Sequence, residues 1–333
     1  MCADIEKVEI LKNKVFKMKK IKLKLFVFFA IIQMAGCSAQ VAKVEPVKLD
    51  TLTTARHGFK TNLLAQERSD NPVRKAPSNV FKMVKYTAAS GDLAAYVTPK
   101  PSDGKKHPAI IWIVGGDSNS IDDVWSSAPR SNDQTAAAYR QAGIVMMFPS
   151  LRGGNNNPGI KEGFLGEVDD ILDAVKYLEK QDYVDPKRIY LGGHSTGGTL
   201  VLLAAESSNR FRAVFSFGPV DDVSGYGIDS GFLPFDVTNR EEVVLRSPIY
   251  WLHSIQTPVW AFEGGEEANT DSLRAMAETS KNPLVHFIEI EKATHFSALA
   301  PTNDLIAKKI LKDTNENSNI SFTKEEVNQY FNK

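Results

Sequence analysis

The stretch "RIYLGGHSTGGTLVLLAA", residues 188–205, joins a short aliphatic and aromatic run to a long apolar one. A block of small and polar residues, 192–198, lies between the two runs and has Ser195 near its centre. The first run is typical of a buried strand and the second of a buried helix. The stretch therefore predicts a tight strand-to-helix turn that carries a serine.

Units of the same kind recur on both sides of this turn. Apolar runs predict strands at 109–114, 144–149, 188–192, 211–218, 258–264 and 285–290, and periodic segments predict helices at 135–143, 167–181, 196–207 and 272–280. Two runs flanking Ser90-Gly91-Asp92 predict a hairpin between residues 80 and 98. Strands that alternate with helices form parallel βαβ units, so we expect an α/β fold with a doubly wound, mostly parallel sheet of about eight strands.

The remaining segments suggest a domain organisation. Residues 37–79 are polar without a sustained period, which predicts a tether. The α/β domain is expected over residues 80–313, and its Gly- and Pro-containing segment 219–252 is a candidate lid, although part of it could be a crossover helix. The tail, residues 314–333, begins a short helix with a Thr323-x-x-Glu326 capping box.

The first 36 residues indicate export. A basic stretch from Met18 precedes an apolar run that ends near Ile32, and Ala35-Gly36 stands directly before Cys37. This order resembles a bacterial lipoprotein signal peptide, which implies cleavage before Cys37, acylation of its thiol and attachment to the cell envelope. Ser38 resembles a sorting signal that implies the outer membrane. The alternatives are a buried N-terminal helix or a simple membrane anchor. Residues 1–17 precede a better start at Met18.

Composition narrows the function classes. The chain has 333 residues, 42% of them hydrophobic and 24% charged, which is typical of a globular protein with a large core. Its formal net charge is zero and no basic patch indicates a nucleic-acid partner. Its only two cysteines, Cys2 and Cys37, cannot cross-link the mature domain. No metal-binding motif is present, so we expect neither a metal nor another cofactor.

The serine at the centre of the opening stretch fits a nucleophile motif. The residues from Gly193 to Gly197 match G-x-S-x-G and stand where a strand passes into a helix. A serine on such a sharp turn needs small residues two positions away on each side, because the turn closes against the sheet and the next helix. The helix N-terminus also favours developing negative charge. The alternative is that Ser195 only caps the helix.

Such a serine needs a base and an acid, in the chain order serine, acid, histidine. His295 follows the last predicted strand and is expected to be the general base and then the general acid. The acid is expected just past the preceding strand, where Glu267 fits best and Glu266 is the alternate. Asp271 is a third carboxylate there, with a more natural role in starting the next helix.

The oxyanion of an acyl-transfer reaction needs hydrogen-bond donors. The backbone N–H of Thr196, directly after the nucleophile, is one expected donor. The second is expected in the loop after the strand at 109–114, where Gly115-Gly116 lets the backbone approach a substrate carbonyl, and Gly116 is the preferred residue. An ordinary strand-to-helix turn is the alternative for this loop.

With these residues the chain resembles the α/β-hydrolase superfamily between residues 108 and 311. Within it, the chain is similar to the catalytic domain of prolyl oligopeptidase-type serine peptidases and to dienelactone hydrolases. The resemblance rests on Arg152-Gly153-Gly154, "VDPKRIYLGGHSTGG", "SPIYWLHSIQTPVWAFEG" and the "THF" that contains His295. It implies a Ser195–Glu267–His295 triad that hydrolyses acyl bonds. The chain departs from the usual peptidase pattern at Val114, at Thr196 and in having glutamates where those peptidases have an aspartate.

These observations predict a membrane-tethered, cofactor-free serine hydrolase. Its substrate would be a carboxylic ester or a peptide bond, because no blade-like strands of a propeller precede the domain to restrict substrate size. Acyl groups of the cell wall or of glycans are a further substrate class. The alternative from another class is a non-catalytic interaction lipoprotein with the same fold, in which the segment 219–252 would serve as the contact surface.

Overall fold

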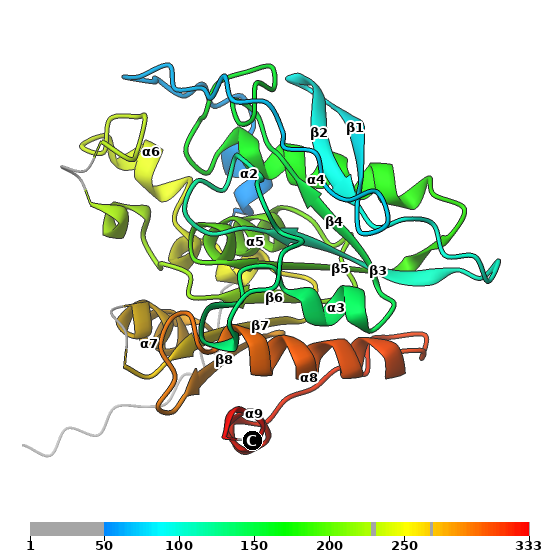
Figure 1. Cartoon of the computed structure of the whole chain (residues 1–333). Helices are drawn as coiled ribbons and strands as arrows, with labels where there is room; N and C mark the ends of the chain where they lie inside the picture. The colour runs from blue at the N-terminus through cyan, green and yellow to red at the C-terminus, as the bar shows by residue number, and fades with distance from the viewer. Residues whose placement is uncertain (1–49, 228–230, 267–268, 333) are drawn as a thin grey trace, which may run out of the picture. The chain divides into compact units, whose positions relative to one another are not determined.

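The computed structural model describes residues 50–332, apart from 228–230 and 267–268, and its described strands form one sheet (Figure 1). The order of its eight strands is β1-β2-β4-β3-β5-β6-β7-β8. The first two pairings, β1 with β2 and β2 with β4, are antiparallel, and all the others are parallel. The strands are β1 (Lys82–Ala88), β2 (Gly91–Val97), β3 (His107–Ile113), β4 (Val145–Pro149), β5 (Val184–His194), β6 (Val214–Phe217), β7 (Val259–Gly264) and β8 (Val285–Ile290). The predicted hairpin and the mostly parallel sheet are confirmed.

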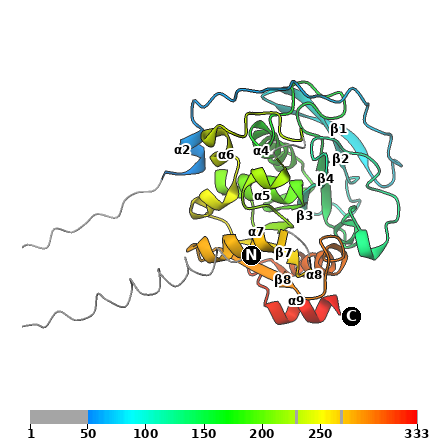
Figure 2. The same cartoon turned by 90° about the vertical axis from the view of Figure 1, so that its left-hand side faces the viewer.

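Helices cover both faces of the sheet, so a central strand such as β3 buries side chains on both of its faces. In β3, Ile111 packs into the core on the side of α4 (Gly166–Glu179) and α5 (Thr196–Ser207). Its neighbour Trp112 packs into the core on the side of α3 (Ala137–Gln141), α8 (Leu299–Lys312) and α9 (Lys324–Phe331). Figures 1 and 2 show these two helical layers. Side chains alternate along a strand, so a two-sided core demands a continuous apolar run.

The predicted helices form where their periodicity places them. Helix α4 buries Val168, Ile171, Val175 and Leu178, the spacing of one helical face. Helix α5 is buried along almost its whole length, as expected of a central helix. Two further helices are α7 (Asn269–Thr279) and the short η1 (Arg130–Asn132). The side chain of Thr323 caps α9 by accepting from the N–H of Glu326 at 3.1 Å.

The prediction of a tether through residue 79 was wrong for residues 50–79, here named the N-terminal segment. This segment packs against the α/β domain, and its helix α2 (Leu52–Arg56) buries Leu52 completely. The guanidinium of Arg56 donates to the carbonyl oxygens of Phe164 and Leu245 at 2.9 and 2.7 Å. The segment has no period because it is docked through single anchoring residues rather than one continuous face. The part of the predicted tether before residue 50, with Cys37, lies outside the described residues.

The segment 219–252 contains short helices in place of one crossover helix. Among the described residues of this segment these are η2 (Val223–Tyr226), α6 (Arg240–Val244), η4 (Pro248–Tyr250) and η5 (Leu252–Ser254). It contacts the N-terminal segment through an isolated bridge between Leu63 and Phe235 and through Glu242, which accepts from Asn62 N–H at 2.8 Å. Its proposed action as a lid stays a prediction. None of the helices in the described part of the chain combines the length and the apolar character needed to span a membrane.

Candidate active site

Ser195 lies at the turn between β5 and α5 in a strained backbone conformation. Its φ and ψ are 56° and −117°, a region that residues other than glycine rarely occupy and that costs about 1–3 kcal/mol. The turn is tied to β6 by the Ser195 N–H, which donates to the carbonyl oxygen of Phe217 at 2.7 Å. The side chain makes no capping hydrogen bond to α5, so the structure does not support the interpretation of Ser195 as a helix cap.

Glycines are required around Ser195 because backbone atoms of neighbouring elements lie too close for a Cβ atom. A Cβ on Gly193 would lie 2.5 Å from the carbonyl oxygen of Gly197, and one on Gly197 would overlap the carbonyl oxygen of Ile113. Only glycine therefore lets β5, α5 and β3 meet at this point. From Leu191 to Leu200, every residue except Ser195 is buried. The packing thus presents the serine alone to the outside.

His295 follows β8 and meets a carboxylate at the end of the neighbouring strand. Its Nδ1 lies 2.9 Å from Oε2 of Glu263, the penultimate residue of β7. The Glu263 side chain is 1% exposed and its other oxygen accepts from the N–H of Gly264 at 2.7 Å. Gly218, at the end of β6, makes room for the pair, because a Cβ there would overlap the His295 ring.

This carboxylate differs from the ones favoured by sequence. Glu267 lies outside the described residues, the Glu266 side chain is exposed, and Asp271 stands in the first turn of α7 with its side chain 90% exposed. The expectation of an acid beyond the strand end did not include Glu263, because this residue is the last but one of the strand itself. A lone carboxylate at the end of the apolar run "VWAFEG" was the available signal, since charged residues are rarely fully buried without a partner.

His194, which precedes the serine, holds the loop that carries His295. Its Nε2 lies 3.1 Å from the carbonyl oxygen of His295, and its Nδ1 lies 3.0 Å from Oε1 of Gln134. Burial, together with the charge of His295, lowers the pKa of His194 to about 3. The ring is therefore neutral and carries a single N–H, so His194 donates a hydrogen bond to only one of these two oxygens. The centroids of the two imidazole rings are 4.4 Å apart, which places His295 beside the serine turn.

The described residues include no hydrogen bond between the Ser195 hydroxyl and the imidazole of His295. Such bonds are often long in the absence of substrate and tighten in the complex. The contact between the rings of His295 and His194, the residue directly before Ser195, brings His295 near the serine turn.

The two predicted oxyanion donors lie against each other. Thr196 is the first residue of α5, so its N–H has no partner within the helix. Its hydroxyl donates to the carbonyl oxygen of Gly116 at 2.9 Å and joins the loop after β3 to the serine turn. Gly116 has a φ of 70°, which favours glycine. Their role as donors stays a prediction.

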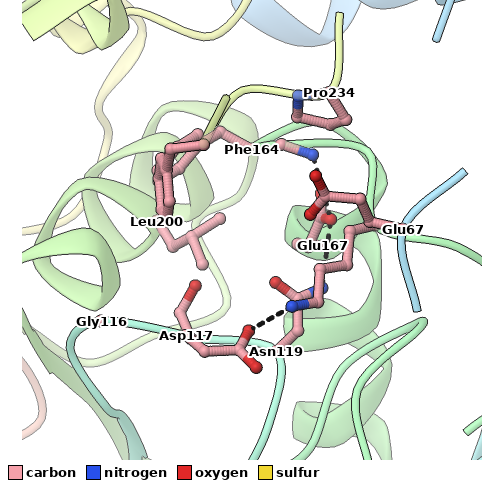
Figure 3. A pocket seen from close by; sticks show the side chains of 12 residues that line it. Glu67, Gly116, Asp117, Asn119, Phe164, Glu167, Leu200 and Pro234 are labelled. Carbon is pink, nitrogen blue, oxygen red and sulfur yellow. Dashed lines mark hydrogen bonds and ion pairs between the residues drawn. The ribbon is translucent and has the colours of Figure 1, made fainter. Parts of the chain in front are cut away.

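A pocket of about 210 Å³ lies next to this loop (Figure 3). Gly116 borders it on one side, and Leu200, one turn into α5, borders it on another. Ser195 and His295 do not line it, so the pocket adjoins the reacting groups rather than enclosing them. It is lined by Glu67, Gly116, Asp117, Ser118, Asn119, Lys161, Gly163, Phe164, Glu167, Leu200, Phe232 and Pro234.

Comparisons with known proteins agree with this architecture. Residues 130–264 match the model of the prolyl oligopeptidase family. The chain is 26% identical over 225 residues to dipeptidyl-peptidase 5 of Porphyromonas gingivalis, covering 61% of this chain and 32% of that protein. It is 23% identical over 230 residues to the acylamino-acid-releasing enzyme of Mus musculus, covering 61% of this chain and 30% of that protein. The chain thus spans about a third of the length of these curated relatives.

Solved structures show the same fold. The acylaminoacyl peptidase of Pyrococcus horikoshii superimposes with a TM-score of 0.57 at 16% identity, over 74% of this chain and 44% of that one. At this identity the likeness establishes the fold and not the reaction. The chain therefore has an α/β-hydrolase fold, and residues 130–264 within it carry the sequence features of the prolyl oligopeptidase family.

Proposed function

We propose that this protein is a serine hydrolase that cleaves a peptide or carboxylic ester bond through an acyl-enzyme. The observation that carries the proposal is the strained, outward-facing Ser195 next to a histidine whose Nδ1 meets a buried carboxylate. The family match and the peptidase relatives support hydrolysis of a peptide bond. The geometry of the site is equally compatible with a carboxylic ester.

In the proposed reaction, Ser195 Oγ attacks the substrate carbonyl carbon while Nε2 of His295 takes the hydroxyl proton. Glu263 accepts the Nδ1–H bond, which orients the ring and stabilises the imidazolium. The N–H groups of Thr196 and Gly116 would stabilise the oxyanion. His295 then returns the proton to the leaving amine or alkoxide as its bond to the acyl carbon breaks. Water, deprotonated by His295, releases the acid and regenerates the serine.

The test is labelling by a fluorophosphonate probe, followed by mass mapping of the adduct. Labelling at Ser195 that is lost in Ser195→Ala and in His295→Ala would support an activated nucleophile. Absence of labelling in the folded wild-type protein would overturn the proposal and favour the non-catalytic interaction protein.

A matched pair of variants tests the acid. Glu263→Gln should lower turnover by as much as roughly 10⁴-fold, the effect of losing the charge that orients a triad histidine. Glu266→Gln removes the same charge nearby from an exposed side chain and should leave turnover unchanged. The reverse result would return the role to the loop beyond β7.

We further propose attachment to the cell envelope through a lipid on Cys37. The support is the basic, apolar and small-residue order before this cysteine. Cys37→Ser should abolish incorporation of radiolabelled palmitate and shift the protein from the membrane to the soluble fraction. Unchanged incorporation would refute the anchor.

A further inference from the structure

The pocket beside Gly116 has one wall that the α/β core does not supply. Glu67 comes from the N-terminal segment, and Phe232 and Pro234 come from the segment 219–252. Residue 67 lies before the part of the chain that matches the family model, which begins at residue 130. The position of Glu67 in this wall therefore depends on how the N-terminal segment docks.

The backbone on both sides of Glu67 is fixed. The carbonyl oxygen of Glu67 accepts from the Lys161 N–H at 2.9 Å, and the Leu64 N–H donates to the carbonyl oxygen of Pro234 at 2.7 Å. Two residues after Glu67, the Ser69 N–H donates to Gly153 at 2.7 Å. The side chain of Glu67 thus extends into the pocket from a defined position (Figure 3).

The charges lining the pocket do not balance. Lys161 Nζ lies 2.8 Å from Oδ1 of Asp117, so these two neutralise each other. The carboxylate of Glu167 accepts from the backbone N–H groups of residues 162, 163 and 165 and from the Asn119 side chain. Among the described residues, the Glu67 carboxylate has no hydrogen-bond or ion-pair partner. The pocket therefore offers one uncommitted negative charge.

The opposite side of the pocket is apolar. Phe164, Leu200 and Phe232 line it, and the ring of Phe164 is within 6.4 Å of that of Phe232, measured between centroids. A carboxylate facing an apolar wall suits a group that carries a positive charge on a hydrocarbon stem. A neutral or anionic group would leave Glu67 without a partner when the substrate displaces water.

We infer that Glu67 makes the N-terminal segment a specificity element that selects substrates with an ammonium group on an apolar stem. The inference rests on the proposed function, because it gives the substrate class of that same site. Either the α-amine of an N-terminal residue or the side-chain amine of a lysine supplies this chemistry.

The experiment uses four thiobenzyl esters, which both esterases and peptidases can cleave: lysyl and norleucyl, each with a free and an acetylated α-amine. Norleucine keeps the stem of lysine and lacks only the ammonium. The wild-type protein should cleave a charged member with a higher kcat/KM than its neutral counterpart. A preference for lysyl over norleucyl esters identifies the side-chain amine as the recognised group. A preference for esters with a free over an acetylated α-amine identifies the α-amine.

In Glu67→Gln, the ratio of kcat/KM for charged over neutral esters should fall by roughly tenfold or more, the effect of losing a hydrogen bond to a charged group. Glu67→Lys should reverse the preference. The control is Asp70→Asn, which removes the same charge from the same segment at a side chain that is 85% exposed and paired with Arg68. The control should keep the wild-type ratio.

An equal loss for all four esters in Glu67→Gln would overturn the inference, since it would indicate a general structural effect. An unchanged ratio would overturn it as well. Fluorophosphonate labelling of Ser195 in the same preparations separates the two proposals. Labelled protein without a charge preference overturns only the inference about Glu67, whereas unlabelled wild-type protein overturns the proposed function and the inference with it.

Discussion

Glu206, in the last turns of α5, is a buried carboxyl group that the proposed reaction does not use. Its residue is 2% exposed, and neither carboxyl oxygen has a hydrogen-bond partner among the described residues. Burial raises the pKa of Glu206 well above its usual value, and the positive charge of Arg56 offsets only part of this effect. The group is therefore protonated in the folded protein at pH values where it is ionised in the unfolded chain.

This difference makes the free energy of unfolding depend on pH. The folded state binds one proton more than the unfolded state above the ordinary pKa of 4.5. Its contribution to stability is fully present below that pH and is lost as the pH rises towards the folded-state pKa. The loss is about 1.4 kcal/mol for each pH unit between the ordinary pKa and the folded-state pKa.

Glu206→Gln removes the titration and keeps the shape of the side chain. The variant should gain stability relative to wild type by about 1.4 kcal/mol for each pH unit above pH 5, until the pH reaches the folded-state pKa of Glu206. The assay is urea unfolding at several pH values. The control is Glu278→Gln on the exposed face of α7, whose unfolding curve should follow that of the wild type at each pH. A constant difference between Glu206→Gln and wild type across this range would refute the reasoning.

Three further predictions test the strained turn at Ser195, the space that Gly218 leaves for His295 and the docking of the N-terminal segment. Ser195→Gly should raise the free energy of unfolding by about 1 kcal/mol, because glycine relieves the strained turn at a small entropic cost. Fluorophosphonate labelling should disappear in this variant. A variant less stable than wild type would contradict the strain at Ser195. Gly218→Ala should displace the His295 ring, lower the free energy of unfolding by about 1–3 kcal/mol and suppress fluorophosphonate labelling. Labelling at the wild-type level would show that the ring has room to move. Leu52→Ala should lower the free energy of unfolding, measured in urea, by about 2–5 kcal/mol. Leu64→Ala, at a residue that is 69% exposed, should lower it by less than about 0.5 kcal/mol. Equal effects would mean that the N-terminal segment is not docked.

The sheet was predictable because its signal is strong and local. The strands that became β3 to β8 are short apolar runs, and α4 and α5 have either a clear helical stripe or an entirely apolar character. Helix α8 was not predicted, although Leu305, Ile306 and Ile310 are buried at helical spacing. Pro301 in its first turn is compatible with a helix start and does not break it.

Local sequence patterns predicted neither the docking of the N-terminal segment nor the contact of Glu263 with His295. Docking through Leu52, Arg56 and Leu63 depends on partners up to about two hundred positions away, and their spacing has no period that a local pattern could show. The position of Glu263 depends on how β7 ends relative to β8, since the strand end rather than the following loop meets His295. Both features depend on how distant segments align in the folded chain, and the periodicity of a local sequence does not specify this alignment.

The contact between Glu263 and His295 also has a consequence for folding experiments. The serine turn ends β5, the carboxylate lies at the end of β7 and the histidine follows β8, so the proposed triad can assemble only when the strands from β5 to β8 are aligned. Pairings between distant segments form slowly because loop closure precedes the contacts that stabilise it. On the proposed mechanism, the time course of probe incorporation during refolding would record the moment when the carboxyl ends of these strands come together.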